Sequence, residues 1–271
     1  MKMPESDKSF TGSLPTIYDT YLVPLIFEPY ATDLAQRLVA RAPTRVLEIA
    51  AGTGVVTRAI ASALPESVSI VATDLNQPML DQAAAHGTSR PVEWRQADAM
   101  SLPFEDESFD AVVCQFGVMF FPDKPKAFSE ARRVLRRGGV FIFSAWDRIE
   151  DNDFANCVTI ALEPMFPGDP PRFMARTPHG YCDASRIEQD LAAGGFASAS
   201  IEAVSCRSRA DSARIPAIAF CQGTPLRNEI ESRHGSLSAA TEVAERAIAG
   251  RFGPDRIDGK IQAHIVTVER S

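Results

Sequence analysis

The chain has 271 residues, of which 45% are hydrophobic and 23% are charged, and its net charge is −7. This length and balance suit one large globular domain with a full buried core. A phosphate backbone is bound by clustered Lys and Arg, so the acidic balance and the lack of a long basic run argue against nucleic acid as a main partner.

Cysteines and histidines show no metal-binding or disulfide pattern. The five cysteines are scattered without a C-x-x-C pair, and the four histidines have no partner at metal-ligand spacing, so we expect no metal site and no disulfide framework. The sequence has no apolar run of membrane-spanning length and no signal-peptide pattern at its start. We therefore expect a cytoplasmic protein without a membrane partner, and its oligomeric state stays open.

Residues 1–40 are expected to form a helical lid. Apolar residues recur at helical spacing between Tyr18 and Leu38, and they predict one or two short helices interrupted at Pro24 and Pro29.

Residues 41–146 alternate between short apolar runs and helical segments. The predicted strands are 46–49, 69–73, 92–96, 111–115 and 140–145, and the predicted helices are 55–64, 77–86 and 124–137. Asn76 is predicted to cap the second helix, and the four arginines 132, 133, 136 and 137 are placed at the end of the third, where they favour the helix dipole. Such alternation predicts a parallel sheet covered by helices on both faces.

Residues 147–271 have a different pattern. Helices are predicted at 153–165, 183–193, 213–222 and 236–251, and strands at 200–205 and 261–268. The segment 206–260 is too long for a hairpin loop, so we expect it to be an insertion. Together with 147–182 it is predicted to form a cap over the substrate.

The stretch Glu48-Ile-Ala-Ala-Gly-Thr-Gly54 is the most informative motif of the chain. It follows a buried strand, consists of small residues after Ile49, and leads into a helix that begins at Val55. Such a loop lets the backbone turn tightly and lets a ligand approach the exposed N–H groups of the helix.

Two further acids follow predicted strands. Asp74 ends the second strand, where a carboxylate can accept hydrogen bonds from both hydroxyl groups of a ribose. The alternative role for Asp74 is a favourable charge at the start of the next helix. Asp98 follows the third strand in the segment Gln96-Ala-Asp-Ala-Met100.

This arrangement resembles the class I S-adenosylmethionine-dependent methyltransferases. Their motif I is an acid followed by x-G-x-G-x-G, and Ala50 stands here in place of the first glycine. The resemblance covers residues 40–146 closely. It implies an α/β fold of three layers, Rossmann-like, whose seven strands run in the order 3-2-1-4-5-7-6 with strand 7 antiparallel, and a single domain over residues 1–271 with 41–146 as the cofactor-binding core.

The resemblance also implies a set of cofactor-binding residues. In relatives, the acid after the second strand holds the ribose, the acid after the third accepts from the adenine, and the end of the fourth meets the methionine amino group. By that correspondence S-adenosylmethionine, with S-adenosylhomocysteine as product, would be bound by Tyr21, Glu48, Ala50, Ala51, Gly52, Gly54, Asp74, Leu75, Met79, Asp98, Ala99, Gln115 and Phe116. Tyr21 is the tyrosine predicted to face the methyl group, and Leu75 and Met79 are predicted to flank the adenine.

The expected reaction is in-line methyl transfer to a small, partly apolar organic acceptor. No catalytic residue is identified, because the transfer needs alignment and exclusion of water before it needs a base. His179 is the one histidine to test as a base, and the turn at 222–226 either reaches the substrate or simply ends a helix. Alternatives are a nicotinamide-dependent oxidoreductase, which Thr57 disfavours by its size, and a non-catalytic S-adenosylmethionine-binding scaffold.

Overall fold

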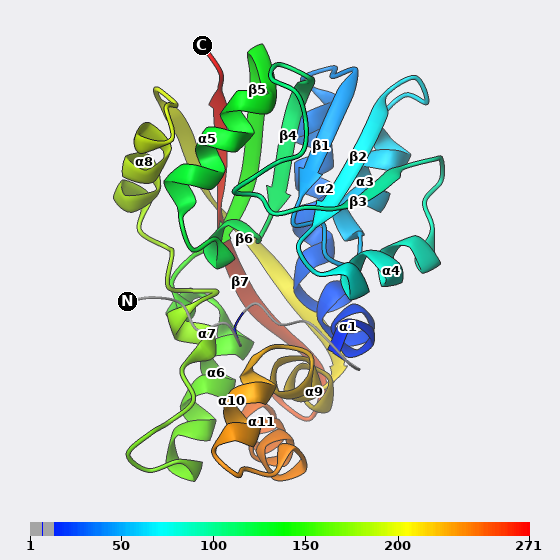
Figure 1. Ribbon diagram of the computed structural model, residues 1–271. Coiled ribbons are helices and arrows are strands. Elements are labelled where there is room, and N and C mark those ends of the chain that lie inside the picture. Colours follow the sequence, from blue (N-terminus) through cyan, green and yellow to red (C-terminus); the bar gives the residue numbers. More distant parts are fainter. Residues whose placement is uncertain (1–6, 8–13) are drawn as a thin grey trace.

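Seven strands form one sheet in the order β3-β2-β1-β4-β5-β7-β6 (Figure 1). The computed structural model describes Asp7 and residues 14–271. The strands are β1 (Arg45–Ile49), β2 (Ser69–Asp74), β3 (Glu93–Gln96), β4 (Phe109–Gln115), β5 (Leu135–Trp146), β6 (Ala199–Ser212) and β7 (Asp255–Glu269). Strands β1 to β5 pair in parallel and β7 is antiparallel to both neighbours, so the predicted order and direction are confirmed.

Helices cover both faces of this sheet. They are α2 (Glu28–Val39) and α3 (Val55–Ala63) on one face and α5 (Lys124–Val134) and α8 (Ala184–Ala193) on the other, while α4 (Gln77–His86) lies beside β3 (Figure 1). The central strands β1 and β4 are buried almost throughout. Burial on both faces explains why these strands read as continuous apolar runs in the sequence.

The four arginines do not all lie at the end of one helix, contrary to our prediction: Arg132 and Arg133 are in the last turn of α5, and the other two are on β5. The helix ends when Leu135 turns to an extended conformation, so Arg136 lies on β5. Arg133 instead pairs with Glu130 at 2.9 Å and reaches Asp106 at 2.8 Å. Arg133 therefore forms one ion pair within α5 and one with the loop before β4, in addition to any interaction with the helix dipole.

The N-terminal segment is helical without the predicted interruptions. It comprises α1 (Leu14–Ile17), the π-helix η2 (Tyr18–Phe27) and then α2. Pro24 lies inside η2, and the second proline of the segment, Pro29, occupies the first turn of α2. A proline in the first turn of a helix removes no needed hydrogen bond, and the π-helical turns accommodate the other.

Strands β6 and β7 form a hairpin much longer than predicted. Their pairing runs from Ala199 opposite Val268 to Ser212 opposite Asp255. In the outer half of the hairpin Arg207 and Arg209 both pair with Asp258. These charged side chains are exposed and lack the apolar pattern of a buried strand, so the sequence pattern predicted an insertion here.

Five helices gather beyond the carboxyl ends of the parallel strands (Figure 1). We call them the cap: α6 (Asp153–Leu162), α7 (Phe173–Arg176), α9 (Arg214–Gln222), α10 (Leu226–Ser232) and α11 (Leu237–Phe252). Short 3-10 turns are η3 (Val118–Phe120), η4 (Ile149–Asp151) and η5 (Glu163–Met165). Within the described part of the chain, no helix has both the length and the apolar character that crossing a bilayer requires.

Candidate functional site

A cleft opens where β1, β2, β3 and β4 end. Its walls come from the loops after these strands and from η2 and η3. They are Tyr18, Ala50, Gly52, Thr73, Asp74, Leu75, Asn76, Met79, Ala97, Asp98, Ala99, Met100, Gln115, Phe116, Gly117, Phe120, Phe121 and Pro122. Most of the residues predicted to bind a cofactor therefore meet at one place: Ala50, Gly52, Asp74, Leu75, Met79, Asp98, Ala99, Gln115 and Phe116.

The loop after β1 is built from left-handed turns. Ala50 has φ 55° and Gly52 has φ 56°, so the small residues of the motif allow a conformation that larger side chains resist. Ala50 is strained relative to glycine here, which explains the glycine in the family pattern. Gly54, at φ 81°, precedes α3, and a Cβ there would lie 3.0 Å from Trp94. Gly54 thus supports the loop from behind, without lining the cleft.

Asp74 is held rigidly at the end of β2. One carboxylate oxygen accepts from the backbone N–H of Gly52 at 2.9 Å, and the other accepts from that of Asn76 at 2.8 Å. Burial raises the pKa of Asp74, and the hydrogen bonds from Asn76 and Gly52 act in the opposite direction. The carboxylate therefore links the loop after β1 to the start of α4. Asn76 makes no side-chain cap bond to α4, and its amide contacts Asp74.

Two other polar groups face the same cleft. Asp98 accepts from the backbone N–H of Met100 at 2.8 Å, which fixes the turn after β3. Gln115 donates from Nε2 to the Phe27 carbonyl at 3.3 Å, and its Oε1 is buried without a donor among the described residues. A buried acceptor without a donor is unusual in a native protein and calls for a ligand that donates. The cleft thus offers carboxylates and an acceptor that fit a ribose, an adenine and an ammonium group.

Glu48 and Ala51 are buried outside the cleft. Thr57 donates from its hydroxyl group to Glu48 at 2.6 Å, which ties β1 to α3. Burial raises the pKa of Glu48 to about 8, above its usual value of 4.5. Glu48 therefore acts in the structure as a neutral buried group that positions the loop.

Tyr21 is not brought to the cleft, contrary to our prediction. It lines a separate surface hollow with Arg209 and Asp211, whereas Tyr18 lines the cleft. In a π-helix, residues three positions apart diverge more than in an α-helix, so the two tyrosines point in different directions. Burial, together with the charges of Asp74 and Asp19, raises the pKa of Tyr18, which therefore stays protonated.

Replacing each of the two tyrosines by alanine, in separate variants, tests this placement. We expect Tyr18→Ala to weaken the binding of S-adenosylhomocysteine about tenfold, because it removes apolar wall from the cleft. Tyr21→Ala should leave the dissociation constant within twofold of wild type. Calorimetric titration of both variants measures this, and equal losses would contradict the assignment.

The pKa of Glu48 predicts a pH-dependent stability. Because the folded protein keeps a proton that the unfolded chain has released, wild-type stability should fall as pH rises from 4.5 through 8, by up to about 5 kcal/mol. Glu48→Gln has no such proton, so its free energy of unfolding should change less over this range. Urea unfolding at pH 5, 7 and 9 measures both curves, and parallel curves would refute a raised pKa.

Aromatic and polar residues of the C-terminal half line two separate cavities. Phe173 and Phe220 line a cavity beside the cleft, Phe154 lines a smaller one with His179, and Thr224 of the 222–226 turn borders the first. Other aromatic residues of this half pack elsewhere. Phe196 contacts Phe141 in the core, for example, so the cap aromatics form no single surface.

Comparison with known proteins agrees with this geometry. Residues 47–143 match the family model described as "Methyltransferase domain". The chain is 42% identical over 103 residues to the ubiquinone/menaquinone biosynthesis C-methyltransferase UbiE of Hahella chejuensis, covering 36% of this chain and 41% of that protein. It is 40% identical over 111 residues to the demethylmenaquinone methyltransferase of Thermus thermophilus, covering 40% and 49%.

Solved structures extend the likeness to the whole fold. YcgJ of Bacillus subtilis superposes with a TM-score of 0.57 at 21% identity, covering 90% of this chain and 99% of that one. The matched part spans less than half the length of the two curated relatives. The family match and the lining of the cleft both lie within residues 18–143, whereas the strand order involves the whole sheet. Residues 47–143 are therefore a methyltransferase domain by sequence, and the observed strand order is the one that the resemblance to the class I S-adenosylmethionine-dependent methyltransferases implies.

Proposed function

We propose that the protein binds S-adenosylmethionine in the cleft and transfers its methyl group to a small organic acceptor. The observation that carries this proposal is that Asp74, Asp98 and Gln115 line one cleft, and that the buried Oε1 of Gln115 has no hydrogen-bond donor among the described residues. Asp74 would hold the ribose hydroxyl groups, and Asp98 with the Ala99 backbone would hold the adenine.

The other cleft residues complete the binding site. Leu75 and Met79 would flank the adenine with apolar surface, and Gln115 would accept from the methionine ammonium group. The small loop Ala50–Gly52 allows close approach of the ligand to the backbone. Bound S-adenosylmethionine supplies a methyl group that is already activated by the sulfonium sulfur.

The protein's contribution is orientation and exclusion of water. Tyr18, Phe116 and Phe120 border both the cleft and the neighbouring cavity, so their rings would surround the point of transfer. Their aromatic faces also suit a cationic sulfonium group. We assign no obligatory catalytic base, because a base is needed only where the acceptor atom must lose a proton during the attack.

The names of the relatives support a small-molecule acceptor. The two curated relatives are named as methyltransferases of quinone biosynthesis, and we extend only the class of reaction to this chain. Of the predicted lid, residues 1–6 and 8–13 lie outside the described residues; we further propose that residues 14–40 act as a lid and that the cap covers the acceptor. The cytoplasmic location and the lack of a nucleic-acid partner stay predictions from the sequence.

Calorimetry with three candidate cofactors tests which of them the protein binds. We expect micromolar binding of S-adenosylmethionine and S-adenosylhomocysteine and no heat with NADH. Binding of NADH alone would reject the proposal in favour of an oxidoreductase. Turnover with a panel of acceptors then separates an enzyme from a scaffold that binds the cofactor without transferring its methyl group.

A further inference from the structure

A second cavity adjoins the cleft beneath the cap, and we call it the aromatic chamber. Its volume is about 60 Å³, and it shares Tyr18, Phe116 and Phe120 with the cleft. Its other walls come from η2, β5, α7 and α9 with their adjoining turns: Leu22, Ile26, Phe27, Trp146, Phe173, Met174, Pro178, Phe220, Thr224 and Pro225. A molecule in the chamber would therefore contact one in the cleft.

No charged side chain is among the residues that line the chamber, within the described part of the chain. The Thr224 hydroxyl group is already used, because it donates to the Phe220 carbonyl at 2.7 Å and accepts from the Leu226 N–H at 3.2 Å. Burying an unpaired charge costs several kcal/mol, so a carboxylate, a phosphate or a primary ammonium group, whose N–H groups need acceptors that a sulfonium does not, is disfavoured in this space.

The aromatic walls of the chamber favour a flat occupant. The Phe116 and Trp146 rings stack with centroids 3.8 Å apart at 6°, and Tyr30 meets both edge-on at 5.2 and 5.5 Å. This cluster makes one rigid aromatic wall between the cleft and the cap. Phe173 from the cap adds a further ring to the lining. Flat unsaturated molecules pack best against such faces.

Two polar side chains, His179 and Asn152, lie behind this wall. The Asn152 amide is already used, because its Nδ2 donates to the Gln262 carbonyl and its Oδ1 accepts from the Gln262 N–H. His179 lines a cavity of about 20 Å³, enough for one water molecule, that shares Ile26, Trp146, Met174 and Phe220 with the chamber. Its ring centroid is 5.9 Å from that of Trp146. Nδ1 of His179 lies 2.8 Å from the Asp147 carbonyl oxygen, which can only accept, so Nδ1 carries the proton. Nε2 therefore remains an acceptor, and no protein partner for it is found among the described residues.

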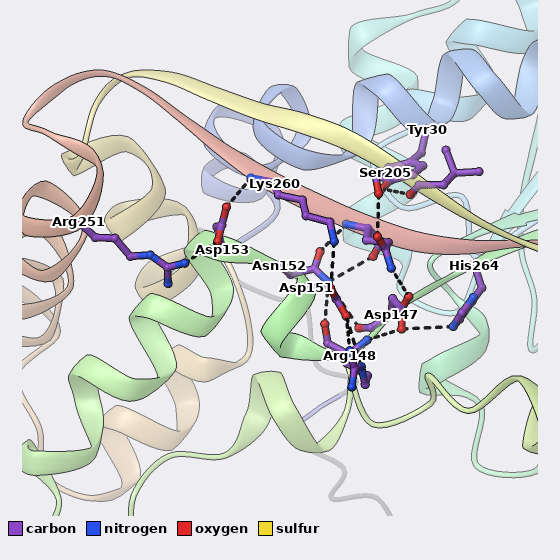
Figure 2. A network of polar contacts seen from close by, with 12 residues as sticks. Tyr30, Asp147, Arg148, Asp151, Asn152, Asp153, Ser205, Arg251, Lys260 and His264 are labelled. Atoms are coloured by element: carbon purple, nitrogen blue, oxygen red, sulfur yellow. Dashed lines mark hydrogen bonds and ion pairs between the residues drawn. The ribbon is translucent and has the colours of Figure 1, made fainter.

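The Asp147 segment that orients His179 is itself fixed. Gln262 donates to its carboxylate at 2.6 Å, the Arg148 N–H donates at 2.7 Å, and His264 lies 3.4 Å away. Figure 2 shows this carboxylate within a polar network that joins the turn after β5 to β7. Burial lowers the pKa of His179 to about 4 despite the nearby acids Glu150 and Asp147, so the ring stays neutral at physiological pH.

We propose that the aromatic chamber, together with the adjoining end of the cleft, binds the methyl acceptor as an uncharged, flat, aromatic molecule whose hydroxyl group donates a hydrogen bond to a water molecule that in turn donates to Nε2 of His179. This inference rests on the proposed function. It makes His179 a positioning residue for the acceptor and says nothing of which atom is methylated.

Four single-ring probes test the proposal on the full chain saturated with S-adenosylhomocysteine. They are 4-methylphenol, toluene, benzoate and benzylammonium, which are similar in size and differ in charge and in the hydroxyl group. NMR titration gives each dissociation constant. We expect 4-methylphenol to bind at least tenfold more tightly than either charged probe.

The variant His179→Phe keeps a flat ring and removes the acceptor nitrogen. We expect it to weaken 4-methylphenol about fivefold, the effect of one hydrogen bond, and to leave toluene within twofold. His179→Gln keeps an acceptor oxygen and should restore part of the difference. Thr224→Val is the matched control within the chamber, because its hydroxyl group is already used, and it should leave the preference for 4-methylphenol over toluene unchanged.

Two results would overturn the proposal: charged probes that bind as tightly as 4-methylphenol, or a loss in His179→Phe that is equal for 4-methylphenol and toluene. If His179→Phe does not fold, the wild-type probe series and His179→Gln still decide it. Failure of the proposed function looks different, because S-adenosylhomocysteine itself would then not bind, while the four probes can still be compared on the protein alone.

Discussion

Asp74→Ala should weaken the binding of S-adenosylmethionine at least 100-fold. The carboxylate is buried in the cleft wall and would accept hydrogen bonds from both ribose hydroxyl groups, and such charge-assisted bonds contribute about 1.5–3 kcal/mol each. The substitution also removes the acceptor for the Gly52 N–H, so the loop after β1 loses its anchor. Calorimetric titration measures the dissociation constant.

Two further variants separate the ligand contact from the loop anchor. Asp74→Asn retains one acceptor oxygen and the side-chain volume, so we expect a loss between those of wild type and Asp74→Ala. Asp81→Ala removes an exposed acid from the neighbouring helix α4, where its carboxylate accepts from Gln77 at 2.8 Å, and should change affinity less than twofold. Wild-type affinity in Asp74→Ala would show that the cofactor binds elsewhere.

Gly117→Ala should damage both stability and cofactor binding, although it adds one methyl group. A Cβ at Gly117 would lie 2.5 Å from the Ala50 Cβ and 2.7 Å from the Cys114 Sγ, distances that require movement of the loop after β1. Overpacking of this kind costs about 1–3 kcal/mol. Because Ala50 and Gly117 both line the cleft, we expect affinity for S-adenosylhomocysteine to fall at least tenfold.

The chain supplies a matched control and a rescue for this variant. At Gly250, in α11, an added Cβ has nothing within 4 Å, so Gly250→Ala should be neutral or stabilising by about 0.5–1 kcal/mol. Adding Ala50→Gly to Gly117→Ala removes the closest contact and should recover part of both losses. Thermal unfolding and calorimetry follow the series, and unchanged unfolding in Gly117→Ala would argue against this packing.

The sequence by itself determined the parallel part of the sheet and most of the cleft, whereas the strand order was an expectation from the resemblance to the family. Asp74 ends the buried strand β2 and Asp98 follows the largely exposed edge strand β3, and the carboxyl ends of parallel strands meet at one edge, so these residues come together. Local pattern is sufficient for this part, because β1, β2 and β4 are largely buried and their apolar runs stand out in the sequence.

Only the tertiary structure decided which N-terminal tyrosine reaches the cleft. Tyr18 and Tyr21 differ by three positions, and the π-helical geometry that directs them apart depends on packing against the cap, since η2 contacts α9. Nothing in the spacing of apolar residues distinguishes a π-helix from an α-helix over ten residues.

The environment of buried polar groups was also decided by the tertiary structure. Glu48 was predicted to bind the cofactor, and in the structure it accepts a hydrogen bond from Thr57 in α3 and does not line the cleft. The rings of His179 and Trp146 lie close together although the two residues are distant in sequence. The outer half of the β6–β7 hairpin escaped prediction because its charged residues are paired across strands. Sequence periodicity reports which face of an element is buried, whereas the partner of a polar group depends on which distant segment folds against it.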